Sequence, residues 1–418
     1  MSGVAATVGA TGARHDRPRL LYVTAMFPFG VGEPFFIPEV EELTRRGWDV
    51  RIVPRSPAGP VMHHDAQELA DLSLCQPIVS WRILAAAVAE LLRNPIAALR
   101  ALGLLLHSNS LRVLRKNLAV YPKGLWLGRV ARSWRADHIH AHWISTTATM
   151  AMVASIVSRI PWSCTAHRGD IADNNLLPVK ASRAAFVRFI SMSGRKMAES
   201  LGVRLPAPRA PVIHLGVRPP ASLPAGERPD GPMVVFCLAN LRPVKGLKYL
   251  IEAMAILKGR LVPCLLAIGG VGHLETELRA MVSRLSLEDR VQFLGFTSHD
   301  KVLGLYEAKK IDLVVLPSVD LGNDLHEGIP VSLMEAMAHG IPVVSTTTGG
   351  IPELLHDGAG ILVPPQDATA LANAIAQLVS NVNLRRTIGE AGRRRILEAF
   401  SVEHVVSELL AQIEGSSC

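Results

Sequence analysis

The chain has 418 residues, of which 49% are hydrophobic and 19% are charged, and its formal net charge is +8 at pH 7. This length suits two domains with separate hydrophobic cores, and the composition excludes an intrinsically disordered protein. The five cysteines are scattered without a CxxC pair, which predicts reduced thiols, no disulfide framework and no zinc site. Residues 1–18 are rich in Gly, Ala and Thr and lack a compact apolar run, so we expect a disordered leader rather than a signal peptide.

The region 19–215 alternates between apolar strands and amphipathic helices. Arg19–Thr24 predicts a buried strand, Glu33–Arg46 a helix that ends at Gly47, and Trp48–Val53 the next strand. The alternation continues after an insertion with a strand, a helix and a strand: Asp137–His142, Thr146–Val157 and Trp162–Ala166. Strands that alternate with helices at this spacing indicate a parallel sheet.

A basic segment rich in Leu and Ala, residues 80–135, interrupts this first domain. Its only acidic residue is Glu90, against ten basic residues: Arg82, Arg93, Arg100, Arg112, Arg115, Lys116, Lys123, Arg129, Arg132 and Arg135. Arg93 and Arg100 break its apolar runs below the ~20 residues that a membrane-spanning helix needs. We favour basic amphipathic helices on an anionic membrane surface over core-packed helices with a solvated basic face. The scarcity of aromatic residues argues against nucleic acid as a partner.

Eight prolines between residues 204 and 232 indicate an interdomain linker region. The second domain, 216–400, predicts six further strands: Met233–Leu238, Pro263–Ile268, Val291–Leu294, Leu313–Pro317, Pro342–Ser345 and Ile361–Val363. Residues 401–418 predict a C-terminal helix that we expect to pack back on the first domain. The fold class is therefore α/β, with two facing Rossmann-like domains and a cleft at the carboxyl ends of the strands, where such sheets bind ligands.

The most informative motif is Glu327–Glu335, in which two carboxylates stand eight positions apart. Gly328 permits a strained backbone angle, and Pro330 suits the first turn of a helix. That helix would point its positive end at residues Gly328, Ile329, Pro330 and Val331, which predicts a phosphate site. Glu335 would bond a vicinal diol such as a ribose, and Glu327 a second sugar. The alternative is a surface loop and helix that happen to carry two glutamates.

This segment resembles the E-x7-E signature of the retaining GT-B glycosyltransferases of family 4, the glycosyl transferases group 1, of the exopolysaccharide and colanic-acid type. The resemblance implies that Glu335 holds the nucleotide ribose and that Glu327 contacts the donor sugar. It also implies a diphosphate contact for Lys245, in a loop where the family pattern G-R-L-x-x-x-K-G has Asn240 in place of Arg. Arg242 could supply the missing charge. His167, in a T-A-H-x-x-D context, is expected to contact the donor sugar.

The resemblance implies further site residues. Arg290, in the segment Asp289–Gly295, is expected at the base pocket, and Gly32, Glu33 and Asp170 on the acceptor side. Glu33 could instead cap the helix that follows it. A zinc site of His138, His140 and His142 is not expected, because three ligands on one straight strand diverge and the family's similar H-A-H segment holds no metal.

The sequence thus predicts a hexosyltransferase-like enzyme that transfers a sugar from a nucleotide diphosphate sugar with retention. The acceptor would be a saccharide or a lipid-linked saccharide of a cell-surface polysaccharide. Neither a metal nor another cofactor is expected, and the protein would work in the cytoplasm at the inner face of the plasma membrane. The alternatives are a GT-B sugar-nucleotide epimerase and a non-catalytic sugar-nucleotide-binding partner in a polysaccharide assembly complex.

Overall fold

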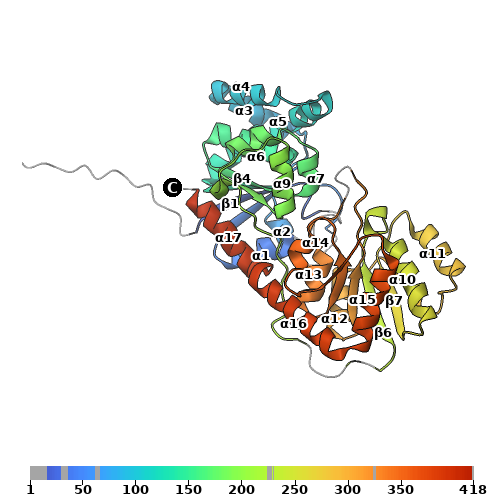
Figure 1. The fold of residues 1–418 in the computed structure, drawn as a ribbon. Helices are drawn as coiled ribbons and strands as arrows, with labels where there is room; N and C mark the ends of the chain where they lie inside the picture. Colours follow the sequence, from blue (N-terminus) through green and yellow to red (C-terminus); the bar gives the residue numbers. More distant parts are fainter. Residues whose placement is uncertain are drawn as a thin grey trace, which may run out of the picture.

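A computed structural model describes residues 17–29, 36–61, 66–223, 228, 230–322 and 326–416. Each half of the chain is built on one parallel sheet, five-stranded in the order β2-β1-β3-β4-β5 and six-stranded in the order β11-β10-β9-β6-β7-β8. Figure 1 shows the N-terminal half above the C-terminal half, with helices against both sheets. The prediction of two Rossmann-like α/β units is confirmed.

The N-terminal sheet contains β1 (Arg19–Thr24), β2 (Asp49–Pro54), β3 (His138–His142), β4 (Trp162–Ala166) and β5 (Val187–Phe189). Around it lie α1 (Ile37–Arg45), α2 (Ala66–Asp71), α6 (Thr146–Ser158), α7 (Arg168–Ala172), α8 (Leu177–Arg183) and α9 (Met192–Ser200). The predicted strands lie within one residue of the observed ones. The sequence did not predict β5, which has three residues and carries the fully buried Arg188 in its middle.

Three helices make up the insertion: α3 (Trp81–Arg93), α4 (Pro95–Leu105) and α5 (Leu111–Trp134). The hydroxyls of Ser80 and Ser110 cap α3 and α5 by accepting backbone N–H groups at 3.2 and 3.3 Å, so the chain itself sets where these helices begin. No helix among the described residues is long and apolar enough to cross a membrane.

Two of the ten basic side chains in the insertion, those of Lys123 and Arg132, face inward and do not belong to its exposed basic surface. The ammonium group of Lys123 is buried and donates to the carbonyl oxygens of Pro54, Arg55 and Gln76 at 2.5–2.8 Å. Burial lowers the pKa of Lys123 to about 7. Arg132 forms an ion pair with the buried carboxylate of Glu90. Arg132 also donates to the carbonyl oxygen of Val157 in α6 at 2.7 Å. Through Lys123 and Arg132 the insertion is therefore bonded to the first domain.

The C-terminal sheet contains β6 (Met233–Leu238), β7 (Cys264–Gly269), β8 (Val291–Gly295), β9 (Leu313–Leu316), β10 (Val343–Thr346) and β11 (Ile361–Val363). The linker carries the short 3-10 helix η2 (Ala207–Arg209), and η3 (Pro243–Lys245) follows β6. The helices are α10 (Leu247–Gly259), α11 (Glu275–Arg284), α12 (His299–Glu307), α13 (Val331–Ala338), α14 (Ile351–Leu355), α15 (Ala368–Ser380) and α16 (Val382–Ala399). All six predicted strands are present, because buried parallel strands read as continuous apolar runs.

The last helix, α17 (Val402–Gly415), returns to the N-terminal half and lies along α1 (Figure 1). Val406, Leu409 and Ile413 are fully buried in one apolar cluster with Val40 and Leu43 of α1. The chain therefore crosses between the halves twice, once in the proline-rich region and once before α17.

Candidate active site

Two oppositely charged side chains meet at the carboxyl edge of the C-terminal sheet. Lys245 follows β6, Glu327 follows β9, and these strands are neighbours in the sheet. The Lys245 ammonium group forms an ion pair with Oε2 of Glu327, and both side chains remain partly exposed. The hydroxyl of Ser318 lies 3.5 Å from the same carboxylate oxygen. The fold thus joins the two motifs that the sequence marked as most informative.

Two glycines hold these loops against each other, backbone to backbone. Gly246 has φ 64°, and a Cβ atom there would lie 1.9 Å from the carbonyl oxygen of Pro317. Gly349 has φ 57°, and a Cβ atom there would lie 1.9 Å from the carbonyl oxygen of Glu327. Gly328 has no positive φ, and a Cβ added there would meet nothing within 4 Å. The strained glycine behind the Glu327 loop is therefore Gly349, and the strain predicted for Gly328 is wrong.

Helix α13 begins at Val331, so its positive end adjoins the Glu327 loop as predicted. Pro330 is the N-cap with φ −76° and ψ 122°, one position before the first turn in which it was expected, and Ile329 before it is buried. Glu335 lies inside α13, where its Oε1 is 3.0 Å from Nε2 of His299 at the start of α12. The edge of the sheet thus carries a helix N-terminus, a cation and two carboxylates.

The other predicted donor residues separate into two groups. Asn240 and Arg242 are exposed on the loop that leads to Lys245, where the backbone N–H of Arg242 donates to the carbonyl oxygen of Asn240 at 2.8 Å. Arg290 lies at the opposite edge of the sheet, just before β8, and donates to the carbonyl oxygens of Val262 and Cys264 at 3.0 and 3.1 Å. The five residues of β8 span about 16 Å. The structure therefore does not bring Arg290 together with Lys245.

In the N-terminal half, His167 and Asp170 join the ends of two strands. His167 follows β4 directly and is the N-cap of α7. The carboxylate of Asp170 accepts the backbone N–H of His167 at 2.7 Å and that of Ile144, after β3, at 2.5 Å. Burial raises the pKa of Asp170 to about 7 and lowers the pKa of His167 to about 3. Asp170 therefore positions the His167 loop, whereas Gly32 and Glu33 lie outside the described residues.

A row of hydrogen bonds determines which nitrogen of His167 carries the proton. The Tyr22 hydroxyl donates to Oε1 of Glu39 at 2.7 Å and lies 2.8 Å from Nδ1 of His142. Because the single hydroxyl proton is committed to Glu39, Nδ1 of His142 must donate, and its Nε2 must accept. Nε2 of His142 lies 2.6 Å from Nε2 of His167, which is then the donor.

Burial keeps His142 and His167 neutral, and the only charged member of the row is the carboxylate of Glu39. The pKa of His142 lies well below its ordinary value, first because of burial and second because of nearby His167. Glu39 is paired with the fully buried guanidinium group of Arg188 at 2.8 Å. We therefore infer that Glu39 acts through Tyr22 and His142 to hold His167 as the neutral tautomer with its proton on Nε2.

The other strand histidines bond to hydroxyls. His138 contacts Ser163 at 2.7 Å, and His140 contacts Ser163 and Thr165 at 2.8 and 2.9 Å. Within the described part of the chain, no group of three or more His, Cys, Asp or Glu residues could hold a metal ion.

The two halves meet beside these groups. Nε of Arg168 donates to the carbonyl oxygen of His326 at 2.9 Å, so the loop after β4 contacts the loop after β9. Glu353 of α14 accepts the backbone N–H of Met192 at 2.9 Å and lies 2.9 Å from Nε2 of His214. Sequence reasoning missed Arg168, although it follows His167. It gave no role to Glu353 either.

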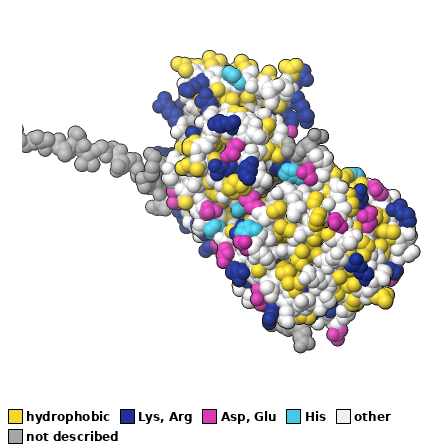
Figure 2. Space-filling view, viewed as in Figure 1, with side chains coloured by type: hydrophobic (Ala, Val, Ile, Leu, Met, Phe, Trp, Pro, Cys, Tyr) yellow, Lys and Arg dark blue, Asp and Glu magenta, His cyan; other side chains and the backbone are white. Residues whose placement is uncertain are grey.

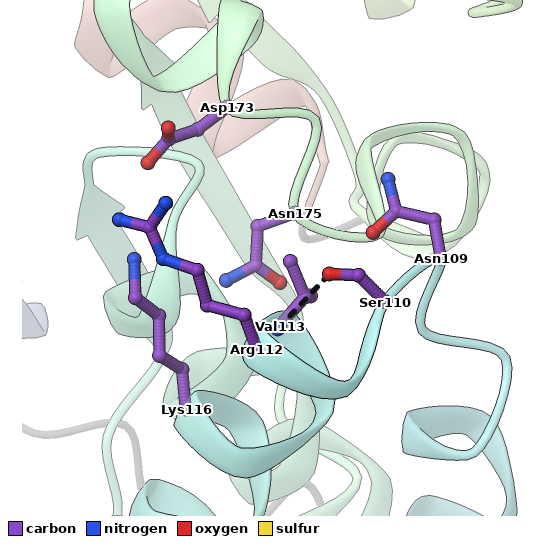
Figure 3. Close-up of a pocket in the computed structure, with 7 residues that line it drawn as sticks. All are labelled: Asn109, Ser110, Arg112, Val113, Lys116, Asp173 and Asn175. Atoms are coloured by element: carbon purple, nitrogen blue, oxygen red, sulfur yellow. Dashed lines mark hydrogen bonds between the residues drawn. The ribbon is translucent and has the colours of Figure 1, made fainter.

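Two surface cavities lie apart from the Lys245–Glu327 pair. One, of about 240 Å³, lies between the start of α5 and the end of α7 and is drawn in Figure 3, where Arg112 and Lys116 extend toward Asp173. Its other lining residues are Asn109, Ser110, Val113 and Asn175. The second, of about 370 Å³, lies at the amino edge of the C-terminal sheet near Asp312.

Residues 221–395 match the family described as Glycosyl transferases group 1. The putative colanic acid biosynthesis glycosyltransferase WcaL of Escherichia coli is 35% identical over 297 residues, which cover 69% of this chain and 73% of that protein. WcaL of Salmonella typhimurium is 32% identical over 251 residues, 59% of this chain and 57% of that protein. The chain thus spans little more than half the length of the Salmonella relative.

The crystal structure of Anabaena HepE in complex with UDP has a TM-score of 0.68 at 18% identity, and the match covers 95% of this chain and 100% of that one. This likeness shows a shared GT-B fold. Together with the E. coli relative, which matches across both halves, it establishes that the chain belongs to the group 1 family of glycosyltransferases.

Proposed function

We propose that the chain transfers a sugar, with retention of anomeric configuration, from a nucleotide diphosphate sugar to a saccharide or lipid-linked saccharide in exopolysaccharide biosynthesis. The observation that carries this proposal is the Lys245–Glu327 pair beside the start of α13, with the His167 loop in contact across the two halves. The colanic acid names of two relatives and the UDP in the HepE structure support the substrate class. The sugar transfer would take place at the inner face of the plasma membrane.

Each donor group then has a distinct role. The diphosphate draws Lys245 away from Glu327 and lies at the N-terminus of α13, with Arg242 as a second cation beside Asn240. Glu335 accepts hydrogen bonds from the ribose, and the released Glu327 carboxylate accepts them from the donor sugar. Stabilising the negative charge that develops on the leaving diphosphate lowers the barrier. His167 contacts the donor sugar from the opposite half, Asp170 positions the His167 loop, and Gly32 and Glu33 belong to the acceptor side.

Retention follows from transfer on one face of the sugar. The bond between the anomeric carbon and the phosphate oxygen breaks, and the bond to the acceptor oxygen forms on the same face. The acceptor hydroxyl gives its proton to the departing phosphate oxygen, so neither a covalent enzyme intermediate nor a metal ion is needed. Activity should therefore survive excess EDTA, and a loss that Mg²⁺ or Mn²⁺ restores would contradict this part of the proposal.

The decisive experiment compares the two glutamates. Thermal shifts with UDP, GDP, ADP and TDP first identify the base, since a bound ligand raises apparent stability by mass action. Glu335→Ala should weaken binding of that nucleotide by about tenfold to more than a hundredfold, whereas Glu327→Ala should mainly lower turnover. Glu398, exposed on α16, gives a matched control in Glu398→Ala. Unchanged nucleotide affinity in Glu335→Ala would overturn the ribose assignment, and NMR of the product must show the donor's anomeric configuration.

A further inference from the structure

The insertion carries an unusual concentration of exposed apolar side chains. More than half of the large hydrophobic residues exposed in the described chain lie between Val79 and Leu118. Within this segment the most exposed are Trp81 at 81%, Leu92 at 78% and Ile96 at 82%. We call the surface formed by Trp81, Leu92, Ile96, Leu99, Leu106 and Leu111 the apolar tip. Exposed apolar side chains gathered at one end of a molecule mark an interaction site.

The packing of α3 and α4 shows that this exposure follows from how the helices are oriented. Their inward face buries Ile83, Ala87, Ala98, Ala101 and Leu105. Both helices hold large apolar residues on the opposite side as well, Trp81 and Leu92 on α3 and Ile96 and Leu99 on α4. A helix that merely covers a core presents a polar face to solvent instead. The two helices thus hold an apolar face away from the protein.

The insertion exposes charge of one sign. Its exposed basic side chains are Arg82, Arg93, Arg100, Arg112, Arg115 and Lys116. Glu90, the only acidic residue between Ser80 and Arg135, is buried against Arg132, so the insertion itself exposes no carboxylate, and Asp173 beside Arg112 and Lys116 belongs to the first domain. Figure 1 places α3 and α4 at the end of the N-terminal half farthest from the C-terminal half. In the same view, Figure 2 shows hydrophobic side chains at that end and Lys and Arg side chains beside and below them.

We propose that the apolar tip docks on a bilayer surface that contains anionic lipid. Apolar residues surrounded by cations match the membrane interface, where acyl chains lie beneath negatively charged headgroups. Trp81 suits this boundary because its ring has an apolar body and a polar N–H. The proposal deepens the localisation in the proposed function but does not depend on the transfer reaction, since the tip lies outside the Lys245–Glu327 site.

Trp81 itself provides the first test. Among the described residues it is the one exposed tryptophan, because the others are buried or partly buried. With vesicles of phosphatidylglycerol and phosphatidylcholine, its fluorescence should shift to shorter wavelength and be quenched by lipids brominated along the acyl chain. The Trp81→Phe variant should lose that quenching while it still sediments with the vesicles. No quenching in the wild-type protein, at a lipid concentration that sediments it, would overturn insertion of the tip.

The second test separates apolar from charged contributions. Leu92→Ser with Ile96→Ser should lower vesicle binding at least tenfold, whereas Val382→Ser with Leu397→Ser, exposed on α16, should leave it unchanged. Replacing Arg93, Arg100 and Arg115 by Gln should lower binding about fivefold per residue, and added salt should weaken the wild type similarly. Every variant must unfold cooperatively with the thermal midpoint of the wild-type protein, measured by circular dichroism, which shows that each is folded. Equal binding to neutral vesicles, or no vesicle binding with self-association through the tip, would overturn the proposal.

Discussion

The two halves of the molecule treat polar side chains in opposite ways. Among the described residues from Met233 to Val363, the buried polar side chains are hydroxyls, those of Ser318, Ser345, Thr346 and Thr348, and the Lys245–Glu327 pair stays partly exposed at the carboxyl edge. The N-terminal half buries imidazoles and an ion pair: His138, His140, His142, Glu39 and Arg188. Charges of the C-terminal half can therefore respond to a ligand, whereas those of the N-terminal half hold one arrangement.

This difference has an energetic reason. A buried charge is costly unless it is paired and hydrogen-bonded, and losing one partner leaves the other uncompensated. Lys245 and Glu327 are partly exposed, so water can take over when the pair opens. Glu39 and Arg188 have no such relief, and Arg188 also donates to the carbonyl oxygens of Ile213 and His214 in the chain that leads to the second half. The N-terminal half, with its buried charges, is thus the rigid half and holds His167 in place. The C-terminal half, with its partly exposed charges, is the half that can respond to a ligand.

Acid should break the N-terminal half first. Burial lowers the pKa of His138, His140 and His167 to about 3, and that of His142 also lies well below 6.5. Between pH 6.5 and 3 the unfolded chain binds more protons, so the stability from these histidines is complete above 6.5 and is lost as the pH falls. Each of the four histidines can lower the free energy of unfolding by up to about 1.4 kcal/mol per pH unit as the pH falls. Asp170 has a raised pKa and takes up a proton in the folded state over this range, so it offsets the effect of one histidine. We expect a net loss of up to about 4 kcal/mol between about pH 6 and pH 5.

Urea unfolding followed by circular dichroism at the two pH values measures this slope. His138→Gln should reduce it by up to about 1.4 kcal/mol per pH unit, and His273→Gln, on an exposed position of the C-terminal half, should leave it unchanged. A flat profile in the wild-type protein would show that the histidines ionise without unfolding the sheet.

The buried ion pair gives the next largest effect. Arg188→Met should destabilise the protein by about 3–5 kcal/mol, because Glu39 would remain buried without its partner. Adding Glu39→Gln should recover part of this loss by removing the unpaired charge. Arg394→Met, at an exposed position on α16, is the control and should change the free energy of unfolding by less than about 0.5 kcal/mol. If Arg188→Met behaved like that control, the pair would not organise the N-terminal sheet.

The exposed pair of the C-terminal half should show the converse behaviour. Lys245→Ala should lower kcat/KM about a hundredfold to a thousandfold, as the loss of a group that stabilises developing charge does, with little change in unfolding. Lys248→Ala, three positions along on the exposed face of α10, should retain activity. A variant at Lys245 that lost stability and kept turnover would make the pair structural and remove the contrast between the halves.

The sequence predicted more of the sheets than of their contacts. β1, β4, β6 and β11 begin and end where their apolar runs predicted, because strands buried on both faces need apolar residues throughout. The strand β5 was missed because it has three residues and Arg188 interrupts its apolar pattern. The partner that makes burial of Arg188 possible is Glu39, on a different element and 149 positions away, which no local pattern reveals.

The same limit applies to the candidate site. Lys245, Glu327, Glu335 and His167 stand in motifs whose spacing has a local physical meaning, and the structure places all four at strand ends or on the adjoining helix. The pairing of Lys245 with Glu327 depends instead on β6 and β9 being neighbours in the sheet order. Arg290 lies just before β8 rather than after it, so the length of that strand separates it from the carboxyl edge that carries Lys245 and Glu327.

The smallest predicted effect concerns the contact between the halves. Glu353 accepts the backbone N–H of Met192 at the start of α9, where a carboxylate also interacts favourably with the helix dipole. Glu353→Gln removes the charge and keeps an oxygen acceptor, so it should weaken this contact by about 0.3–1 kcal/mol. The expected result is a change of no more than about fivefold in kcat/KM, with an unchanged nucleotide affinity, because Glu353 contacts Met192 and His214 and not the Lys245–Glu327 pair. Glu390→Gln, in an exposed ion pair with Arg386 on α16, serves as the control.

Small-angle scattering should show a slightly larger radius of gyration for Glu353→Gln only. A large loss of nucleotide affinity would place Glu353 in the donor site and erase the division between a rigid half and a responsive one.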